Sequence, residues 1–178
     1  MIPLSLAQIA AVTGGTVCGD PTLVVTGPAY LDSRSPHSQG LFVAIAGERV
    51  DGHSFTAQAH AVLGSRATCR PTVVVPNPVV ALGRLARHVV AAVAPTVLAV
   101  TGSHGKTTIR DYLAALLPGA VATSGNQNNE LGVPLRAVQL KADNDFLVLE
   151  MGARGVGHLS YLCDIACTGH GWSWRSTW

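Results

Sequence analysis

The stretch that decides the fold is Val97-Leu98-Ala99-Val100-Thr101-Gly102-Ser103-His104-Gly105-Lys106-Thr107-Thr108. An apolar run leads into a glycine loop, and a helical pattern follows the Lys-Thr-Thr segment. The two glycines let the backbone bend so that successive N–H groups surround a phosphate, and the helix directs its positive N-terminal end at the same place. The stretch therefore predicts a strand, a phosphate-binding loop and a helix. The alternative is a glycine turn beside a surface lysine.

Two kinds of side chain in this loop suit a phosphate chain and a metal ion. Lys106 supplies a mobile positive charge for the outer phosphates, and the hydroxyl of Thr107 or Thr108 can ligate magnesium. The loop has the shorter form Thr-Gly-x-x-Gly-Lys-Thr, because Val100 stands where the eight-residue Walker pattern requires a glycine.

The composition excludes several classes of protein. The chain has 178 residues, enough for one large domain or two small ones. Its net charge is +2 and it has no basic run, so it lacks the electrostatic footprint of a nucleic-acid-binding protein. The longest apolar stretch, Val89 to Val100, is interrupted by Pro95 and is too short to cross a bilayer. Because the N-terminus also lacks the basic segment of a secretory signal, we expect a cytoplasmic protein without nucleic-acid partners or membrane insertion.

Up to about residue 80, the sequence predicts a small α/β unit. Ser5 is suited to cap a helix that ends at Gly14, and short apolar runs predict strands. The alanine-rich stretch 55–62 predicts another helix. Asn77 and Pro78 are suited to begin a further helix as N-cap and first helical residue. The predicted strands cover 23–25, 41–45 and 72–75, and the apolar face of the last helix comprises Leu82, Leu85, Ala86, Val89 and Val93.

A second unit contains the phosphate loop. Its strands and helices alternate, which predicts a parallel sheet with ligands bound at the carboxyl ends of the strands. The predicted strands are 96–100, 121–123 and 146–149, and the predicted helices are 107–117 and 135–140.

Glu150 directly follows the buried strand 146–149, as a Walker B carboxylate does. Two neighbouring parallel strands end at the same edge of a sheet, so Glu150 and the phosphate loop are expected in one crevice. Magnesium takes oxygen ligands from carboxylates, hydroxyls and phosphates. The alternative is an ordinary glutamate where a strand emerges into solvent.

Taken together, these motifs resemble those of the Mur ligases, a family that forms amide bonds in peptidoglycan assembly. The loop Thr101-Gly-Ser-His-Gly-Lys-Thr-Thr108 is similar to the family's ATP loop. Two further segments resemble the MurF type, namely Asn128-Asn-Glu-Leu-Gly-Val-Pro134 and Val148-Leu-Glu-Met-Gly-Ala-Arg154 with Gly157-His158. Three others resemble its uridine-nucleotide domain, namely Asp32-Ser-Arg34, Leu41-Phe-Val-Ala44 and Gly47-Glu-Arg-Val-Asp-Gly-His53.

The resemblance implies an α/β fold with two domains. Residues 1–80 would form a small UDP-substrate-binding domain, and 81–166 an incomplete parallel-sheet domain that binds ATP at the P-loop. The family pattern stops after Ala166, and 167–178 form an aberrant tail that holds all three tryptophans. A shifted reading frame and a divergent natural tail are both compatible with this change. We expect little activity from this chain alone, and a monomer for the intact form.

The resemblance also implies a reaction, in which ATP phosphorylates the terminal carboxylate of UDP-N-acetylmuramoyl-tripeptide and D-alanyl-D-alanine attacks the acyl phosphate. Lys106 and Glu150 would be catalytic, and Thr107 and Glu150 would hold Mg²⁺. The ATP-binding residues would be Gly102, Ser103, His104, Gly105, Lys106, Thr107 and Thr108. The UDP-substrate would contact Ser33, Arg34, Asn128 and Asn129.

Three alternatives stay open. The first 80 residues could act as a non-catalytic module that binds a UDP-nucleotide. A MurE-type ligase is the nearest competitor within the family, although its usual Thr-Thr-Pro segment is absent. An unrelated P-loop kinase or GTPase is disfavoured, because the chain has no Asn-Lys-x-Asp guanine signal.

Overall fold

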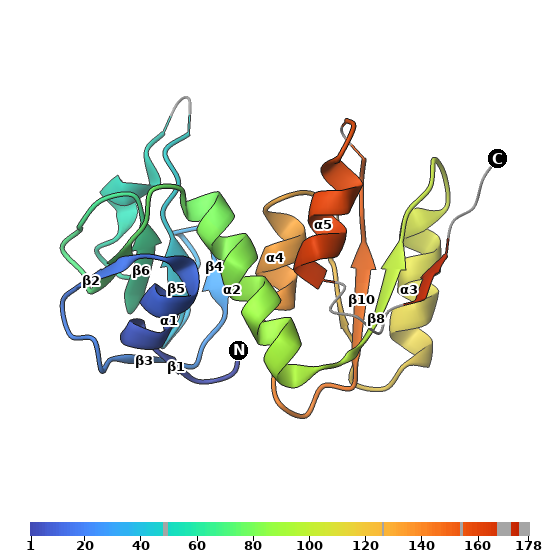
Figure 1. Cartoon of the computed structure of the whole chain (residues 1–178), viewed down its shortest axis with the longest axis horizontal. Coiled ribbons are helices and arrows are strands. Elements are labelled where there is room, and N and C mark those ends of the chain that lie inside the picture. Colours follow the sequence, from blue (N-terminus) through green and yellow to red (C-terminus); the bar gives the residue numbers. More distant parts are fainter. Residues whose placement is uncertain (48–49, 126, 154, 167–171, 175–178) are drawn as a thin grey trace. The chain divides into compact units, whose positions relative to one another are not determined.

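A computed structural model describes residues 1–47, 50–125, 127–153 and 155–166, together with the backbone of 172–174. The chain divides into two compact units, Met1–Leu85 and Ala86–Trp178. The division falls within helix α2 (Pro78–Val93), the long green helix of Figure 1. None of the helices in the described part of the chain has the length and apolar character needed to span a bilayer.

The first unit is built on a five-stranded sheet with the order β2-β7-β6-β5-β4. The strands from β4 to β7 run parallel, and β2 pairs antiparallel with β7. A separate antiparallel pair joins β1 (Leu4–Ser5) to β3 (Val24–Val25). The strands of the large sheet are β2 (Thr16–Cys18), β4 (Ala29–Tyr30), β5 (Leu41–Val43), β6 (Ala61–Gly64) and β7 (Thr72–Val74).

Both predicted ends of helix α1 (Leu6–Thr13) and the predicted start of helix α2 are confirmed. Helix α1 begins with a capping box, in which Ser5 and Gln8 exchange hydrogen bonds, and it ends at Gly14 in the left-handed conformation. At the start of α2, Asn77 Oδ1 accepts hydrogen bonds from the backbone N–H groups of Val79 and Val80 at 2.9 and 3.2 Å. Both helices therefore start where a polar side chain satisfies their first free N–H groups.

The predicted helix over 55–62 is wrong. A 3-10 turn, η1 (Gly52–Phe55), ends at the first residue of this stretch, and strand β6 begins at Ala61. Ala61 pairs with Leu41 in the sheet, and Arg70 Nε donates to the carbonyl of Ala57 at 2.8 Å. Ala59 and Ala61 are buried in the core. Packing against distant residues has here overridden the helix propensity of alanine.

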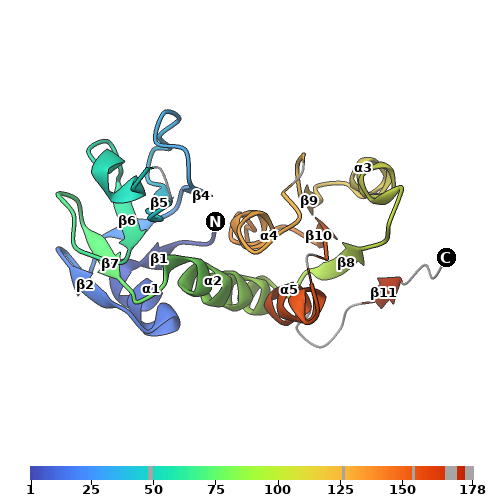
Figure 2. The same ribbon diagram turned by 90° about the horizontal axis from the view of Figure 1, so that it is seen from above.

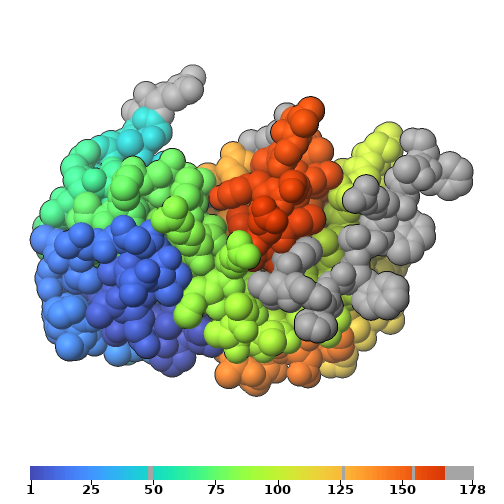
Figure 3. All heavy atoms as spheres, viewed as in Figure 1, coloured from blue at the N-terminus to red at the C-terminus, as the bar shows by residue number. Residues whose placement is uncertain are grey.

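The second unit contains a parallel sheet with the order β11-β8-β10-β9. Figure 2 shows α3 and α5 on opposite faces of this sheet, and in Figure 3 α5 forms part of the visible surface. The elements are β8 (Thr96–Val100), α3 (Lys106–Leu116), β9 (Val121–Ala122), α4 (Gly132–Ala137), β10 (Phe146–Glu150), α5 (His158–Ala166) and β11 (Trp172–Trp174).

Helix α4 begins at Gly132 rather than at the predicted Leu135. Asn129 Oδ1 accepts hydrogen bonds from the backbone N–H groups of Leu131 and Gly132 at 3.2 and 2.9 Å. These bonds satisfy the first free donors of the helix, which explains the earlier start. Asn129, one residue of the polar Asn128–Glu130 cluster, thus stabilises the start of a helix.

Candidate functional site

Strands β8 and β10 end side by side, and this places the phosphate loop next to Glu150. Their register pairs Val100 with Glu150, and the N–H of Met151 donates to the carbonyl of Val100 at 2.9 Å. The loop 101–105 leaves the sheet at this point, and α3 starts at Lys106. The structure therefore brings the predicted loop and the predicted carboxylate to one edge of the sheet.

Within the phosphate loop, the side chain of Lys106 is hydrogen-bonded to the loop backbone. Gly105, the N-cap of α3, has φ +76°, a left-handed conformation that a residue with a side chain adopts only with strain. The ammonium group of Lys106 donates to the carbonyl of Gly102 at 2.7 Å. His104 is exposed, and its Nδ1 lies 3.2 Å from Ser103 Oγ. The ammonium group of Lys106 and the N-terminal end of α3 thus lie together at this loop, an arrangement that favours a bound phosphate.

Glu150 is a buried carboxylate with partners on both oxygens. Its exposed fraction is 2%. Oε2 accepts a hydrogen bond from Thr107 Oγ1 at 2.8 Å, and Oε1 accepts one from Asn128 Nδ2 at 3.1 Å. The backbone N–H of Glu150 donates to Thr123 Oγ1 at 2.8 Å. Because burying a charge is costly unless it is hydrogen-bonded, these partners make the position of the carboxylate specific.

Arg110 is a site residue that the sequence patterns did not indicate. Its Nη1 lies 3.4 Å from Glu150 Oε2, and its exposed fraction is 5%. One signal could have revealed it, since Arg110 follows Thr107 by three positions and therefore shares its face of the helix.

Of the predicted substrate residues in the second unit, Asn128 contacts Glu150, whereas Asn129 accepts hydrogen bonds from the N–H groups at the start of α4. The backbone of Asn128 accepts a hydrogen bond from the N–H of Gly152 at 2.8 Å. A Cβ atom on Gly152 would lie 3.1 Å from the Cγ and Oδ1 atoms of Asn128, which is tighter than most Cβ contacts. The glycine at 152 therefore leaves room for the Asn128 amide beside the carboxylate.

The other predicted substrate residues, Ser33 and Arg34, lie in a turn of the first unit after β4. Arg34 Nε and Nη2 donate to the carboxylate of Asp32 at 2.9 and 2.7 Å. The side-chain hydrogen bond from Arg34 lowers the pKa of Asp32 to about 2. The side chain of Arg34 is 87% exposed. A contact of Ser33 or Arg34 with a uridine nucleotide stays a prediction.

In the same unit, His53 joins a loop to the end of β6. The ring is buried, its Nδ1 lies 2.6 Å from Asp51 Oδ1, and its Nε2 accepts a hydrogen bond from the backbone N–H of Ser65 at 2.9 Å. Because Nε2 accepts, the proton of the neutral ring resides on Nδ1. Three residues of the motifs quoted above, Glu48, Arg49 and Arg154, lie outside the described residues, as do 167–171 and 175–178 of the tail.

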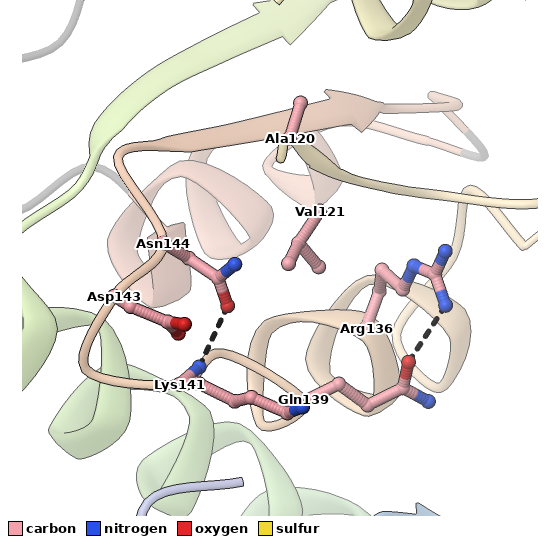
Figure 4. A pocket seen from close by; sticks show the side chains of 7 residues that line it. All are labelled: Ala120, Val121, Arg136, Gln139, Lys141, Asp143 and Asn144. Carbon is pink, nitrogen blue, oxygen red and sulfur yellow. Dashed lines mark hydrogen bonds between the residues drawn. The ribbon is translucent and has the colours of Figure 1, made fainter. Parts of the chain in front are cut away.

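A separate pocket of about 290 Å³ lies near the amino ends of β9 and β10, away from Glu150 (Figure 4). Two hydrogen bonds cross its wall, from Arg136 Nη1 to Gln139 Oε1 at 2.6 Å and from the Lys141 N–H to Asn144 Oδ1 at 2.8 Å. It is lined by Ala120, Val121, Arg136, Gln139, Lys141, Asp143 and Asn144.

The side-chain oxygen atoms of Glu150 and Thr107 are suited to ligate a magnesium ion. A carboxylate and a hydroxyl lie 2.8 Å apart beside the phosphate loop, and Mg²⁺ is commonly held by one or two carboxylates with phosphate and water completing its shell. The described part of the chain has no group of three or more His, Cys, Asp or Glu side chains that could hold a metal by themselves. The donor set therefore suits a metal that arrives with a phosphate ligand.

Residues 100–169 match the family described as "Mur ligase middle domain". The chain is 37% identical over 204 residues to UDP-N-acetylmuramoyl-tripeptide--D-alanyl-D-alanine ligase of Mycobacterium tuberculosis, over 93% of this chain and 40% of the relative. It is 36% identical over 173 residues to the protein of that name from Escherichia coli, over 90% of this chain and 37% of the relative. The chain thus spans about 40% of the length of these relatives.

Solved structures are similar over the same part. A crystal structure of MurF from Acinetobacter baumannii matches with a TM-score of 0.81 and 31% identity, over 92% of this chain and 39% of that chain. MurF ligase from Thermotoga maritima, solved in complex with ADP, matches with a TM-score of 0.69 and 36% identity, over 80% of this chain and 36% of that chain.

Proposed function

The chain belongs to the Mur ligase family, and we propose that it carries the ATP-binding and UDP-substrate-binding residues of a ligase that joins D-alanyl-D-alanine to UDP-N-acetylmuramoyl-tripeptide. The observation that carries the proposal is the 2.8 Å hydrogen bond between Thr107 Oγ1 and Glu150 Oε2, beside the phosphate loop. The names of the relatives support the choice of substrates. The ADP complex of the Thermotoga maritima protein supports ATP as the nucleotide.

In the proposed reaction, the residues of this chain position groups and neutralise charge. The ammonium group of Lys106 would exchange the Gly102 carbonyl for phosphate oxygens. Thr107 and Glu150 would hold Mg²⁺, which when bound neutralises charge on the phosphates. The γ-phosphoryl group passes to the terminal carboxylate of the tripeptide as ADP leaves. The neutral amine of D-alanyl-D-alanine then attacks the acyl carbon. As the amide forms, the C–O bond to phosphate breaks and inorganic phosphate leaves with the surplus proton of the amine.

The proposed contacts with the UDP-linked substrate come from both units. Ser33 and Arg34 would contact the uridine nucleotide, in a domain over 1–80. Asn128 and Asn129 would lie near the reacting end of the peptide, in an ATP-binding domain over 81–166. The proposal includes a cytoplasmic site of action, because ATP and nucleotide-linked precursors are its substrates.

Binding measurements on the whole 178-residue chain test this function. Isothermal titration should show one site for ADP in the presence of Mg²⁺ and a second for the UDP-linked tripeptide, and UDP should compete at the second site alone. Binding of the UDP-linked tripeptide without ADP would favour a non-catalytic nucleotide-binding module. Tighter binding of the UDP-linked dipeptide than of the tripeptide would favour a MurE-type ligase. Failure to bind either nucleotide would contradict the proposal.

A further inference from the structure

Arg110 connects three segments of the second unit. It lies on α3, one turn beyond Lys106, and its side chain is only 6% exposed. Nη1 donates to the carbonyl of Gly125 at 3.0 Å and to Glu150 Oε2 at 3.4 Å. Nε and Nη2 donate to Oδ1 of the neighbouring Asp111 at 3.0 and 2.6 Å. One guanidinium group therefore joins α3, the turn after β9 and the end of β10.

The same nitrogen of Arg110 serves both Gly125 and Glu150, so the two partners are held together. The guanidinium group is planar and its N–H groups point in fixed directions. A displacement of the Gly125 turn would therefore pull Nη1 away from the carboxylate. This turn leads into the segment that carries Asn128, whose amide holds the other oxygen of Glu150. The orientation of the carboxylate thus depends on Arg110 directly and through the following loop.

Two opposite consequences of removing Arg110 can be weighed. Without the positive charge of Arg110, Mg²⁺ would bind more readily beside Glu150. Without its hydrogen bonds, the Glu150 carboxylate would be less well oriented, and Mg²⁺ would bind less readily. The contact between Nη1 and Oε2 is 3.4 Å, long beside the roughly 2.7–2.9 Å of a charge-assisted hydrogen bond between these groups. Nη1 is also held by the carbonyl of Gly125 at the shorter distance of 3.0 Å. Because this second bond anchors the guanidinium group when a metal approaches Oε2, we expect the effect on orientation to be the larger one.

We propose that Arg110 is a positioning residue, which holds the Glu150 carboxylate beside Thr107 and thereby sets the metal-dependent part of nucleotide binding. The proposal rests on the proposed function, because it requires a nucleotide and Mg²⁺ at the phosphate loop. Arg110 acts through Glu150 and the Gly125 turn, and no contact with the nucleotide is assigned to it.

The test measures the affinity of the full chain for ADP by isothermal titration, once in EDTA and once in Mg²⁺. For Arg110→Met, the affinity in EDTA should stay within about twofold of wild type, while the gain produced by Mg²⁺ should fall by about fivefold or more. Arg110→Lys, which keeps the charge, should recover part of this gain. The control is Arg84→Met, since Arg84 lies in the first unit, outside the unit that holds Glu150, and its Nη1 donates to the backbone carbonyl of Thr13 at 3.0 Å. This variant should keep the full gain.

The outcomes separate this proposal from the one on which it rests. If wild type binds no ADP in either condition, both proposals fail. If wild type shows a gain with Mg²⁺ that Arg110→Met keeps within twofold, the positioning role fails and the proposed function stands. A larger gain in Arg110→Met would identify Arg110 as a competitor of the metal, which also overturns the positioning role. Should Arg110→Met fail to fold in a thermal melt, Arg110→Lys decides, because a gain equal to wild type would then overturn the proposal.

Discussion

Two acidic residues with basic neighbours, Glu150 and Asp32, have very different surroundings. Glu150 is 2% exposed, and its carboxylate receives bonds from Thr107 and Arg110 of α3 and from Asn128 in the loop before α4. Asp32 is bonded by Arg34 two positions along the same turn, and their side chains are 49% and 87% exposed. Residues brought together from distant segments define an oriented group, whereas an exposed pair within one turn can form in many local structures. The first arrangement therefore carries more information about function.

The largest expected effect is a loss of stability when a buried side chain of β10, the strand that ends at Glu150, is shortened. Leu149 is fully buried, so Leu149→Ala should lower the free energy of unfolding by about 2–5 kcal/mol, through lost burial and the cavity left behind. Urea denaturation of the whole chain measures this change. Val24→Ala is the control, because Val24 is 44% exposed and should cost far less. Equal losses in the two variants would show that β10 is not the tightly packed support assumed here.

The next effect concerns the charge in the phosphate loop. Replacing Lys106 with Met should weaken ADP binding by roughly 10- to 100-fold, because a hydrogen bond to a charged group contributes about 1.5–3 kcal/mol. The measurement is titration of the full chain with ADP in Mg²⁺. The exposed Lys141, in the wall of the separate pocket, provides the control as Lys141→Met. An unchanged affinity in Lys106→Met would remove Lys106 from the nucleotide site.

A smaller effect is expected from pH in the first unit. Bonds from His53, followed by that from Arg66, lower the pKa of Asp51 from 3.8 to about 2. A carboxyl group whose pKa is lower in the folded state contributes stability above about pH 4, and this contribution is lost as the pH falls through 2. The variant Asp51→Asn should therefore show a flatter thermal midpoint between pH 4 and pH 2 than wild type. A dependence as steep as that of wild type would show that other groups cause it.

The smallest effect is expected at Asp32. Its partner Arg34 is mostly exposed, and such ion pairs contribute little because water and salt screen them. We expect Asp32→Asn to leave the thermal midpoint at pH 7 unchanged within error, at low and at high salt. A clear, salt-dependent loss would show that the exposed pair is more specific than its surroundings suggest, and would weaken the contrast with Glu150.

Features that depend on residues close together in the chain could be predicted from the sequence. The capped helix starts at Ser5 and Asn77 depend on neighbouring residues, and strand β10 with Glu150 at its end follows from an apolar run. The helix predicted over 55–62 was wrong because distant packing and the bond from Arg70 decide that segment. Arg110 was missed because its burial depends on the distant Gly125 and Glu150, although its spacing from Thr107 places both residues on one face of α3.

The central claim is that the phosphate loop and Glu150 form one site for a nucleotide with its metal ion. Titration of ADP into the full chain, with EDTA and with Mg²⁺, tests it most directly when wild type is compared with Glu150→Gln. The account predicts that Mg²⁺ strengthens the binding of ADP to wild type. In Glu150→Gln, this gain in affinity should fall by at least about tenfold, while the affinity in EDTA stays near that of wild type. A variant that keeps the full gain with Mg²⁺ would contradict the claim.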